Sequence, residues 1–219
     1  MKKLILFSFG GTLVLSDDDV INVWRKAIKK AGLLPDEQMI YLEHYGEDFE
    51  KIILPKMAAK YKWTAEQVNI VVVEAKKVFR QINSSINSGL ADKLTALKKE
   101  GLYFLALISN RKLKDVKDGL SKIGLSLEMF DFVKTAENGA KKPDPKAFDI
   151  LEHFSSEEVI FVGSDPNKDW AAAKALGIDF VHITTSSLIG FWQVMSFPEE
   201  KIFLNVPDYV DSLLKEIRG

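Results

Sequence analysis

The chain has 219 residues, of which 47% are hydrophobic and 28% are charged, a balance typical of a globular protein with a sizeable core. Thirty basic residues against 31 acidic ones leave a formal net charge of −1, which gives no electrostatic reason to expect nucleic acid or an anionic membrane as a partner. Because the chain contains no cysteine, disulfides, zinc–thiolate sites and thiol catalysis are excluded.

Six short segments rich in β-branched and aromatic residues are predicted strands. Most are apolar throughout rather than alternating, as expected of strands that are covered on both faces. They are residues 3–8, 102–109, 130–135, 158–163, 180–184 and 202–206, and helical patterns cover residues 90–99, 113–123, 145–154, 169–176 and 207–217. Strands that alternate with helices of this length predict an α/β fold, with a Rossmann-like, open, mainly parallel sheet and helices on both faces.

Residues 16–87 interrupt this alternation directly after the first strand. Apolar residues recur there at helical spacing, and Thr64 and Gln67 have the spacing of a capping box. Residues 37–45 and 49–61 are also helical in pattern, with Pro55 interrupting the second. We therefore predict an all-helical domain over residues 16–87, inserted into an α/β core of residues 1–15 and 88–219.

Polar segments follow four of the predicted strands. In open parallel sheets, ligands bind beyond the carboxyl ends of the strands, so these segments are the candidates for a site. In chain order they are SFGGT (8–12), SNR (109–111), AENGAKKPDP (136–145) and GSDPNKDW (163–170).

In this order, and with a helical insertion after the first strand, the segments resemble those of the haloacid dehalogenase-like (HAD) hydrolase superfamily, in the branch with a helical cap. In that family the first strand ends D-x-D-G-[TV], where the first aspartate is the nucleophile and the second is the general acid/base. A Ser or Thr after the second strand and a lysine after the third, often in K-P-x-P, bind the phosphoryl group. Acids in G-D-x-x-x-x-D after the fourth strand hold Mg²⁺.

The resemblance implies that the frame is retained while the acids are replaced. Ser8 occupies the nucleophile position and Gly10 the acid/base position, and Ser164 stands at the first metal-binding acid. Asp169 matches the second metal-binding acid.

The hydroxyl and lysine positions of the family are kept. Ser109 corresponds to the phosphate-binding hydroxyl, and Lys142 in KKPDP corresponds to the lysine, although the adjacent Lys141 leaves the alignment open by one residue.

These replacements alter the expected chemistry. A serine hydroxyl is essentially un-ionised and needs an adjacent base, and Gly10 offers none. The three histidines, His44, His153 and His182, are interpreted as surface or structural residues. We expect no catalytic residue of the family type and no ordinary phosphatase or dehalogenase turnover.

The same replacements weaken the expected metal site. Mg²⁺ is the cofactor that the resemblance implies, and it usually takes one or two carboxylates in addition to water and phosphate. Only Asp165 and Asp169 are left as candidate ligands, and Asp169 fits equally well as the N-cap of the helix that follows. We expect no cofactor.

What is retained favours a small anion. A glycine-rich turn that exposes backbone N–H groups forms an anion-binding concavity, and without carboxylates an anion could bind there without metal. Arg111, Lys112 and Lys114 are interpreted as a solvated face at a helix start. The candidate anion-binding residues are Gly10, Gly11, Thr12, Ser109, Asn110 and Lys142.

Three hypotheses remain open. The first is a HAD-like pseudoenzyme that binds an anionic or phosphorylated small molecule or acts through a partner surface. The second is an active hydrolase that uses unconventional acids such as Asp165 or Asp169. The third is a structural protein with a vestigial pocket. A protein partner or a homo-oligomer is possible in each, and the absence of a signal-peptide pattern or a membrane-spanning run predicts a cytoplasmic protein with no membrane partner.

Overall fold

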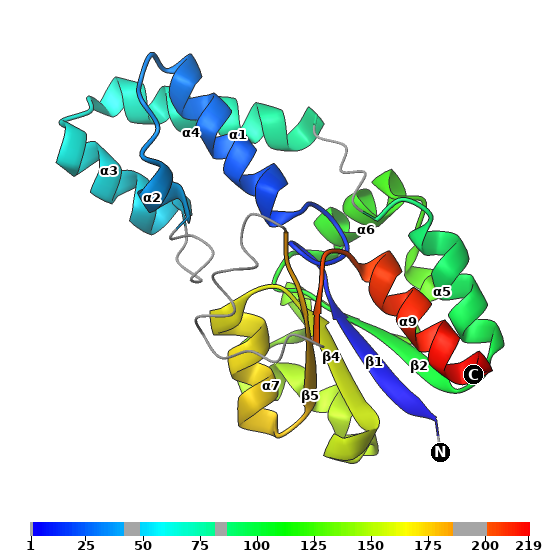
Figure 1. Ribbon diagram of the computed structural model, residues 1–219. Coiled ribbons are helices and arrows are strands. Elements are labelled where there is room, and N and C mark those ends of the chain that lie inside the picture. Colours follow the sequence, from blue (N-terminus) through cyan, green and yellow to red (C-terminus); the bar gives the residue numbers. More distant parts are fainter. Residues whose placement is uncertain (1, 42–48, 82–86, 186–200) are drawn as a thin grey trace. The chain divides into compact units, whose positions relative to one another are not determined.

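The computed structural model describes residues 2–41, 49–81, 87–185 and 201–219, which form two compact units (Figure 1). One unit comprises residues 1–16 with 84–219, and the other comprises residues 17–83. Within the described residues, no helix is both long enough and apolar enough to cross a membrane.

The larger unit is built on a six-stranded sheet in the order β3-β2-β1-β4-β5-β6. Every strand pair is parallel, which confirms the predicted open α/β sheet. The first strand in the sequence is therefore central, between β2 and β4. The strands are β1 (Lys3–Ser8), β2 (Tyr103–Ile108), β3 (Phe132–Lys134), β4 (Val159–Gly163), β5 (Asp179–Ile183) and β6 (Ile202–Phe203).

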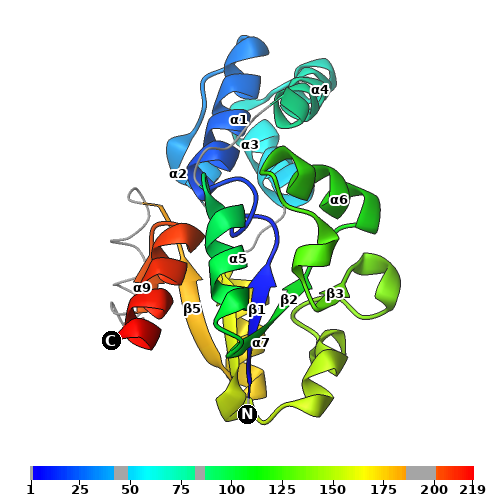
Figure 2. The same cartoon turned by 90° about the vertical axis from the view of Figure 1, so that its right-hand side faces the viewer.

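Helices cover both faces of this sheet because successive strand side chains point to opposite sides. Ile5 and Phe7 of β1 belong to one core cluster, whereas Leu4 and Leu6 belong to another. Figure 1 shows α5 and α9 on one side of the sheet and α7 on the other, and Figure 2 shows α5 and α9 side by side. The helices of this unit are α5 (Leu90–Lys99), α6 (Leu113–Lys122), α7 (Ala171–Leu176) and α9 (Val206–Arg218).

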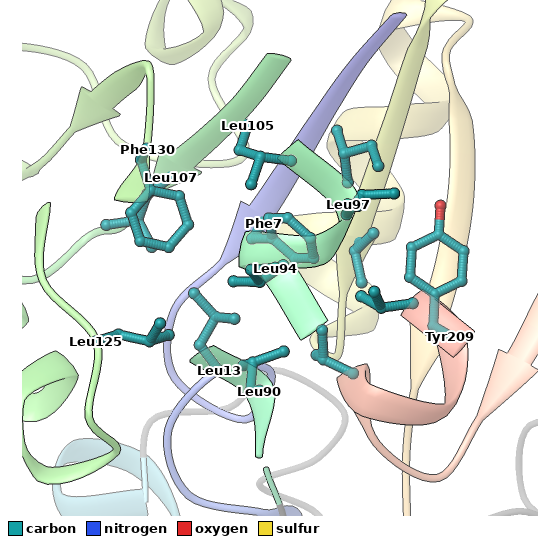
Figure 3. Packing of buried hydrophobic residues seen from close by; sticks show 14 of the residues in the cluster. Phe7, Leu13, Leu90, Leu94, Leu97, Leu105, Leu107, Leu125, Phe130 and Tyr209 are labelled. Atoms are coloured by element: carbon teal, nitrogen blue, oxygen red, sulfur yellow. The ribbon is translucent and has the colours of Figure 1, made fainter. Parts of the chain in front are cut away.

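The first core cluster joins the sheet to α5 and α9. Figure 3 shows Phe7 of β1, Leu105 of β2, Leu94 of α5 and Tyr209 of α9 meeting there. Phe7 is fully buried and packs edge-on against Phe130, with ring centroids 6.4 Å apart. Burial of such side chains contributes about 1.5–3 kcal/mol each, so this cluster holds the central strand in place.

Two predicted elements differ from those observed by more than a small shift of their ends. Residues 145–154 are not one regular helix, because the 3-10 segment η5 (Pro145–His153) is kinked at Phe148. This residue leaves helical geometry at φ −111°, and its ring centroid lies 5.6 Å from that of Phe161. The predicted strand 202–206 stops at Phe203, because Asn205 accepts a hydrogen bond from the Asp208 N–H at 2.8 Å and starts α9.

Short helical segments make the remaining connections. Tertiary packing and caps, rather than helical periodicity, define them, which explains why most were not predicted. They are the 3-10 helices η3 (Leu127–Met129), η4 (Ala136–Asn138) and η6 (Ser156–Glu158), and the π-helical turn η7 (Pro166–Trp170).

The smaller unit is helical and has its own core. Trp24 stacks on Phe49 with ring centroids 4.1 Å apart and meets Phe79 edge-on at 5.8 Å. The capping box is confirmed, since the Gln67 N–H donates to Thr64 Oγ1 at 3.2 Å and the Thr64 N–H donates to Gln67 Oε1 at 2.8 Å. Its helices are α1 (Asp17–Lys30), α2 (Glu37–Tyr41), the π-helical turn η2 (Phe49–Ile53), α3 (Leu54–Tyr61) and α4 (Ala65–Gln81).

At the predicted interruption near Pro55 the helix changes type rather than breaks. The π-helical turn η2 ends at Ile53, which keeps helical φ and ψ, and α3 starts at Leu54 with Pro55 in its first turn. The predicted helix 37–45 is described only as far as Tyr41, because residues 42–48 lie outside the described part of the chain. The role of this unit as a cap stays a prediction.

Candidate functional site

Three serines end neighbouring strands at one edge of the sheet. Ser8 is the last residue of β1, Ser109 follows β2, and Ser164 follows β4. Because β1 pairs in parallel with both β2 and β4, the three carboxyl ends are adjacent. The serines are 3%, 5% and 6% exposed, respectively, so they line the floor of this edge rather than its surface.

Lys142 reaches into this edge from the segment after β3. Its Nζ donates to Ser8 Oγ at 2.7 Å and to Asp169 Oδ1 at 2.5 Å. Lys142 is 7% exposed, whereas Lys141 is exposed. Lys142, rather than Lys141, therefore contacts the other strand-end segments, and it links the first and the fourth of them.

Asn110 holds the backbone of Lys142 in place. The N–H of Lys142 donates to Asn110 Oδ1 at 2.8 Å, and Asn110 Nδ2 donates to the Lys142 carbonyl at 2.9 Å. The amide of Asn110 therefore keeps only one N–H that is not used for this clamp. Its observed role is to position Lys142.

Asp169 is 1% exposed, and both of its carboxylate oxygens accept hydrogen bonds from groups of the protein. Oδ1 accepts from Lys142, and Oδ2 accepts from the N–H groups of Ser164 and Asp165 at 3.1 and 3.2 Å. This pose requires glycine at position 163, because a Cβ there would lie 2.6 Å from the Asp169 Cβ. A buried carboxylate is stable only when it is paired and hydrogen-bonded, and each of these contacts serves that need.

The predicted cap at Asp169 is wrong, because Asp165 caps the helix instead. Asp165 Oδ1 accepts from the N–H groups of Asn167 and Lys168, both at 2.9 Å, and Oδ2 accepts from Lys168 Nζ at 2.5 Å. Pro166 explains the earlier start, since its ring fixes a helical φ and it has no N–H to leave unsatisfied at the first helical position.

These residues do not fit Mg²⁺. The three family acid positions hold Ser8, Gly10 and Ser164, none of which carries a charge. The oxygens of Asp165 and Asp169 already accept the bonds described above. Within the described residues no group of three or more His, Cys, Asp or Glu side chains is placed to hold a metal ion.

Among the described residues, no general base contacts Ser8. An ammonium that is ion-paired with Asp169 donates its hydrogen bond to Ser8 Oγ and cannot take the hydroxyl proton. Ser164 Oγ contacts the Gly10 carbonyl at 3.4 Å, so it supplies no base either. The arrangement positions a hydroxyl without activating it.

His182 lies in β5 and is fully buried. Burial lowers the pKa of His182 to about 3, although the nearby Asp169 carboxylate acts in the opposite direction. His153 is exposed at the end of η5, and His44 lies outside the described residues. His182 is thus neutral near pH 7 and is a core residue.

The low pKa of His182 predicts a specific loss of stability in acid. Between pH 6.5 and about 3 the unfolded chain binds a proton at this residue that the folded protein does not, so the free energy of unfolding falls as the pH falls through that window. We expect a contribution of about 1.4 kcal/mol per pH unit that is absent from His182→Leu. Urea unfolding at pH 7 and pH 5 measures this change, with His153→Leu as the exposed control. The prediction would be contradicted if the free energy of unfolding of wild type and of His182→Leu changed equally between the two pH values.

The loop after β1 offers one free hydroxyl. Gly11 has φ +78°, a conformation suited to glycine, and its N–H donates to the Val14 carbonyl at 3.0 Å. The Gly11 N–H is therefore used within the loop and is not available to an anion, contrary to the prediction. Thr12 Oγ1 is buried and has no hydrogen-bond partner within the described part of the chain.

Arg111 belongs to this edge, which the sequence analysis missed. It is exposed, as expected of a helix start, but its guanidinium lies over the first loop: a Cβ at Gly10 would be 3.5 Å from Arg111 Nη2. Ser109 Oγ accepts from the Arg111 N–H at 3.0 Å and thereby orients the residue. Its place directly after Ser109 and Asn110 at a strand end was the available signal.

Comparison with known proteins places this geometry in a family. The model of the haloacid dehalogenase-like hydrolases matches residues 5–183, a range that contains all four strand-end segments. The chain belongs to the haloacid dehalogenase-like hydrolase family. This haloacid dehalogenase-like protein is similar to the phosphoglycolate phosphatase of Vibrio cholerae serotype O1, with 26% identity over 184 residues that cover 80% of this chain and 81% of that protein.

Solved structures support the same fold. A Thermotoga maritima protein proposed to be a β-phosphoglucomutase superimposes with a TM-score of 0.69 at 20% identity and covers 99% of both chains. A β-phosphoglucomutase from Clostridium difficile gives a TM-score of 0.62 at 16% identity, covering 99% of this chain and 97% of that one. At these identities the comparison establishes only the architecture of this haloacid dehalogenase-like protein.

Proposed function

We propose that this haloacid dehalogenase-like protein binds a small anionic or phosphorylated molecule without metal at the carboxyl edge of its sheet, and that it lacks ordinary phosphatase or dehalogenase turnover. The observation that supports this proposal most directly concerns Asp169. Its two carboxylate oxygens accept hydrogen bonds from Lys142 and from two backbone N–H groups. With neutral residues at positions 8, 10 and 164, the described part of the site has no carboxylate at the nucleophile position, and Asp165 and Asp169 are held by bonds within the protein.

The remaining groups suit an anion. The Lys142 ammonium has three N–H donors, of which Ser8 and Asp169 take two, and the Thr12 hydroxyl has no partner among the described residues. Two unit charges 4 Å apart interact by about 4 kcal/mol at an effective dielectric constant of 20, so removing carboxylates from such an edge removes a repulsion of that order. The helical unit would act as the cap domain of this protein.

A second candidate is an active phosphatase. The similar Vibrio cholerae protein is named a phosphoglycolate phosphatase, and this favours hydrolysis of a phosphate ester by unconventional acids such as Asp165 or Asp169. Against it stand the observed bonds of both carboxylates, which would have to break before either could act. Cytoplasmic location and a protein or homo-oligomeric partner are further parts of the proposal.

Turnover separates the two candidates. We expect phosphate release from an aryl phosphate in Mg²⁺ to lie several orders of magnitude below about 1 s⁻¹, because losing the nucleophile of a site that works as a unit removes most of its rate enhancement. A steady rate near about 1 s⁻¹ would overturn the proposal in favour of the phosphatase. Calorimetry with inorganic phosphate should give the same affinity in Mg²⁺ and in EDTA.

A further inference from the structure

The charge of Lys142 is already balanced within the protein. Its Nζ lies 2.5 Å from Asp169 Oδ1, and both side chains are almost fully buried, at 5% and 1% exposed. The pair is neutral as a whole, so an anion bound at this edge needs a second cation to attract it.

Arg111 is such a cation. Its side chain is exposed, and within the described part of the chain no carboxylate lies within ion-pair distance of it. The nearby Glu137 carboxylate instead accepts the N–H of Leu113, at 2.9 Å to Oε2. The guanidinium charge is therefore open to a ligand from solvent.

The structure holds Arg111 from both sides of its backbone. Its N–H donates to Ser109 Oγ at 3.0 Å, and its carbonyl accepts from the Ala136 N–H at 2.9 Å. The guanidinium carbon lies 6.0 Å from the centroid of the buried Phe9 ring, a cation–π distance. These contacts direct the side chain toward the loop after β1.

Gly10 and Arg111 are complementary. A Cβ at position 10 would lie 3.5 Å from Nη2 and 3.7 Å from Nε of Arg111, so any longer side chain there would compete with the guanidinium for space. At position 10, where the family has an acid, there is thus no side chain, and the Arg111 guanidinium lies beside this space.

We propose that Arg111 is the charged ligand-binding residue of this site. It binds a phosphate group, either free or as a monoester, and supplies the positive charge that Mg²⁺ would otherwise supply. The guanidinium presents parallel N–H donors that match two oxygens of a phosphate, and such charge-assisted bidentate contacts are stronger than neutral hydrogen bonds. This inference rests on the proposed anion-binding function and names the group that supplies its charge.

The test is calorimetric titration in EDTA with two probes, inorganic phosphate and an alkyl phosphate monoester, which separate the two sources of the phosphate group. Arg111→Gln should weaken binding of the preferred probe by about 10- to 100-fold, the range for hydrogen bonds to charged groups. Lys114→Gln, which removes a neighbouring exposed charge on α6, should stay within about twofold of wild type. Arg111→Lys should fall between, since it keeps the charge and loses the fork.

A second variant keeps the inference falsifiable if Arg111→Gln is poorly folded. Gly10 does not have a positive φ, so Gly10→Asp is compatible with its backbone. In EDTA, its carboxylate would pair with Arg111 and abolish the metal-free binding of phosphate. Wild-type affinity in either Arg111→Gln or Gly10→Asp would overturn the role of Arg111 and leave the proposed function standing. Failure of the wild-type protein to bind either probe at millimolar concentration would overturn both.

Discussion

Replacing Lys142 with methionine is expected to lower the free energy of unfolding by about 3–5 kcal/mol, the usual cost of breaking a buried ion pair by removing one partner. Methionine keeps much of the length of the lysine stem, so the loss is chiefly electrostatic. It leaves the Asp169 carboxylate, 1% exposed, with two backbone N–H donors but no counter-charge. Urea unfolding of wild type and Lys142→Met measures the difference.

Two further variants make this result specific. Lys141→Met removes the exposed neighbouring lysine and should change the free energy of unfolding by less than about 0.5 kcal/mol. Lys142→Met combined with Asp169→Asn removes both charges and should recover most of the loss, because a neutral amide can still accept from the N–H groups of Ser164 and Asp165. A cost for Lys142→Met below about 1 kcal/mol would mean that the pair is solvated and does not organise the site.

The sheet could be predicted from the sequence because its signal is local and repeated. Leu4 and Leu6 face one core and Ile5 and Phe7 the other, so an unbroken apolar run is the expected mark of a strand buried on both faces. The order of the strand-end segments also located the edge where Ser8 and Lys142 meet.

What the sequence left open depends on where individual side chains point. Asp165 and Asp169 are both reasonable N-caps, and Pro166 decides between them only once the first helical turn is in place. Arg111 matches the pattern of a solvated helix start. Its direction toward Gly10 depends on a local bond to Ser109 and on a bond from the Ala136 N–H that joins the ends of β2 and β3. Long-range contacts of this kind leave no periodic trace in the chain.

Restoring the family acids is expected to create hydrolysis. The combined change Ser8→Asp, Gly10→Asp and Ser164→Asp should raise Mg²⁺-dependent phosphate release from an aryl phosphate by about 10³-fold or more over wild type, with no rise in EDTA. The frame needed for this is present: position 8 lies beside the Lys142 ammonium, and position 164 follows β4 next to the carboxylate of Asp169. Position 10 has room for a Cβ, whose nearest neighbour would be Arg111 at 3.5 Å.

The matched control is the triple asparagine variant, Ser8→Asn, Gly10→Asn and Ser164→Asn, which adds side chains of the same size without charge. It should stay at the wild-type rate, because neutral amides neither attack phosphorus as carboxylates do nor supply the charge that Mg²⁺ requires. A folded aspartate variant that is no faster than the asparagine variant would show that the strand ends have lost more than their acids. In that case Lys142, Ser8 and Asp169 would be a buried structural network, and the proposed anion site would fall with the frame.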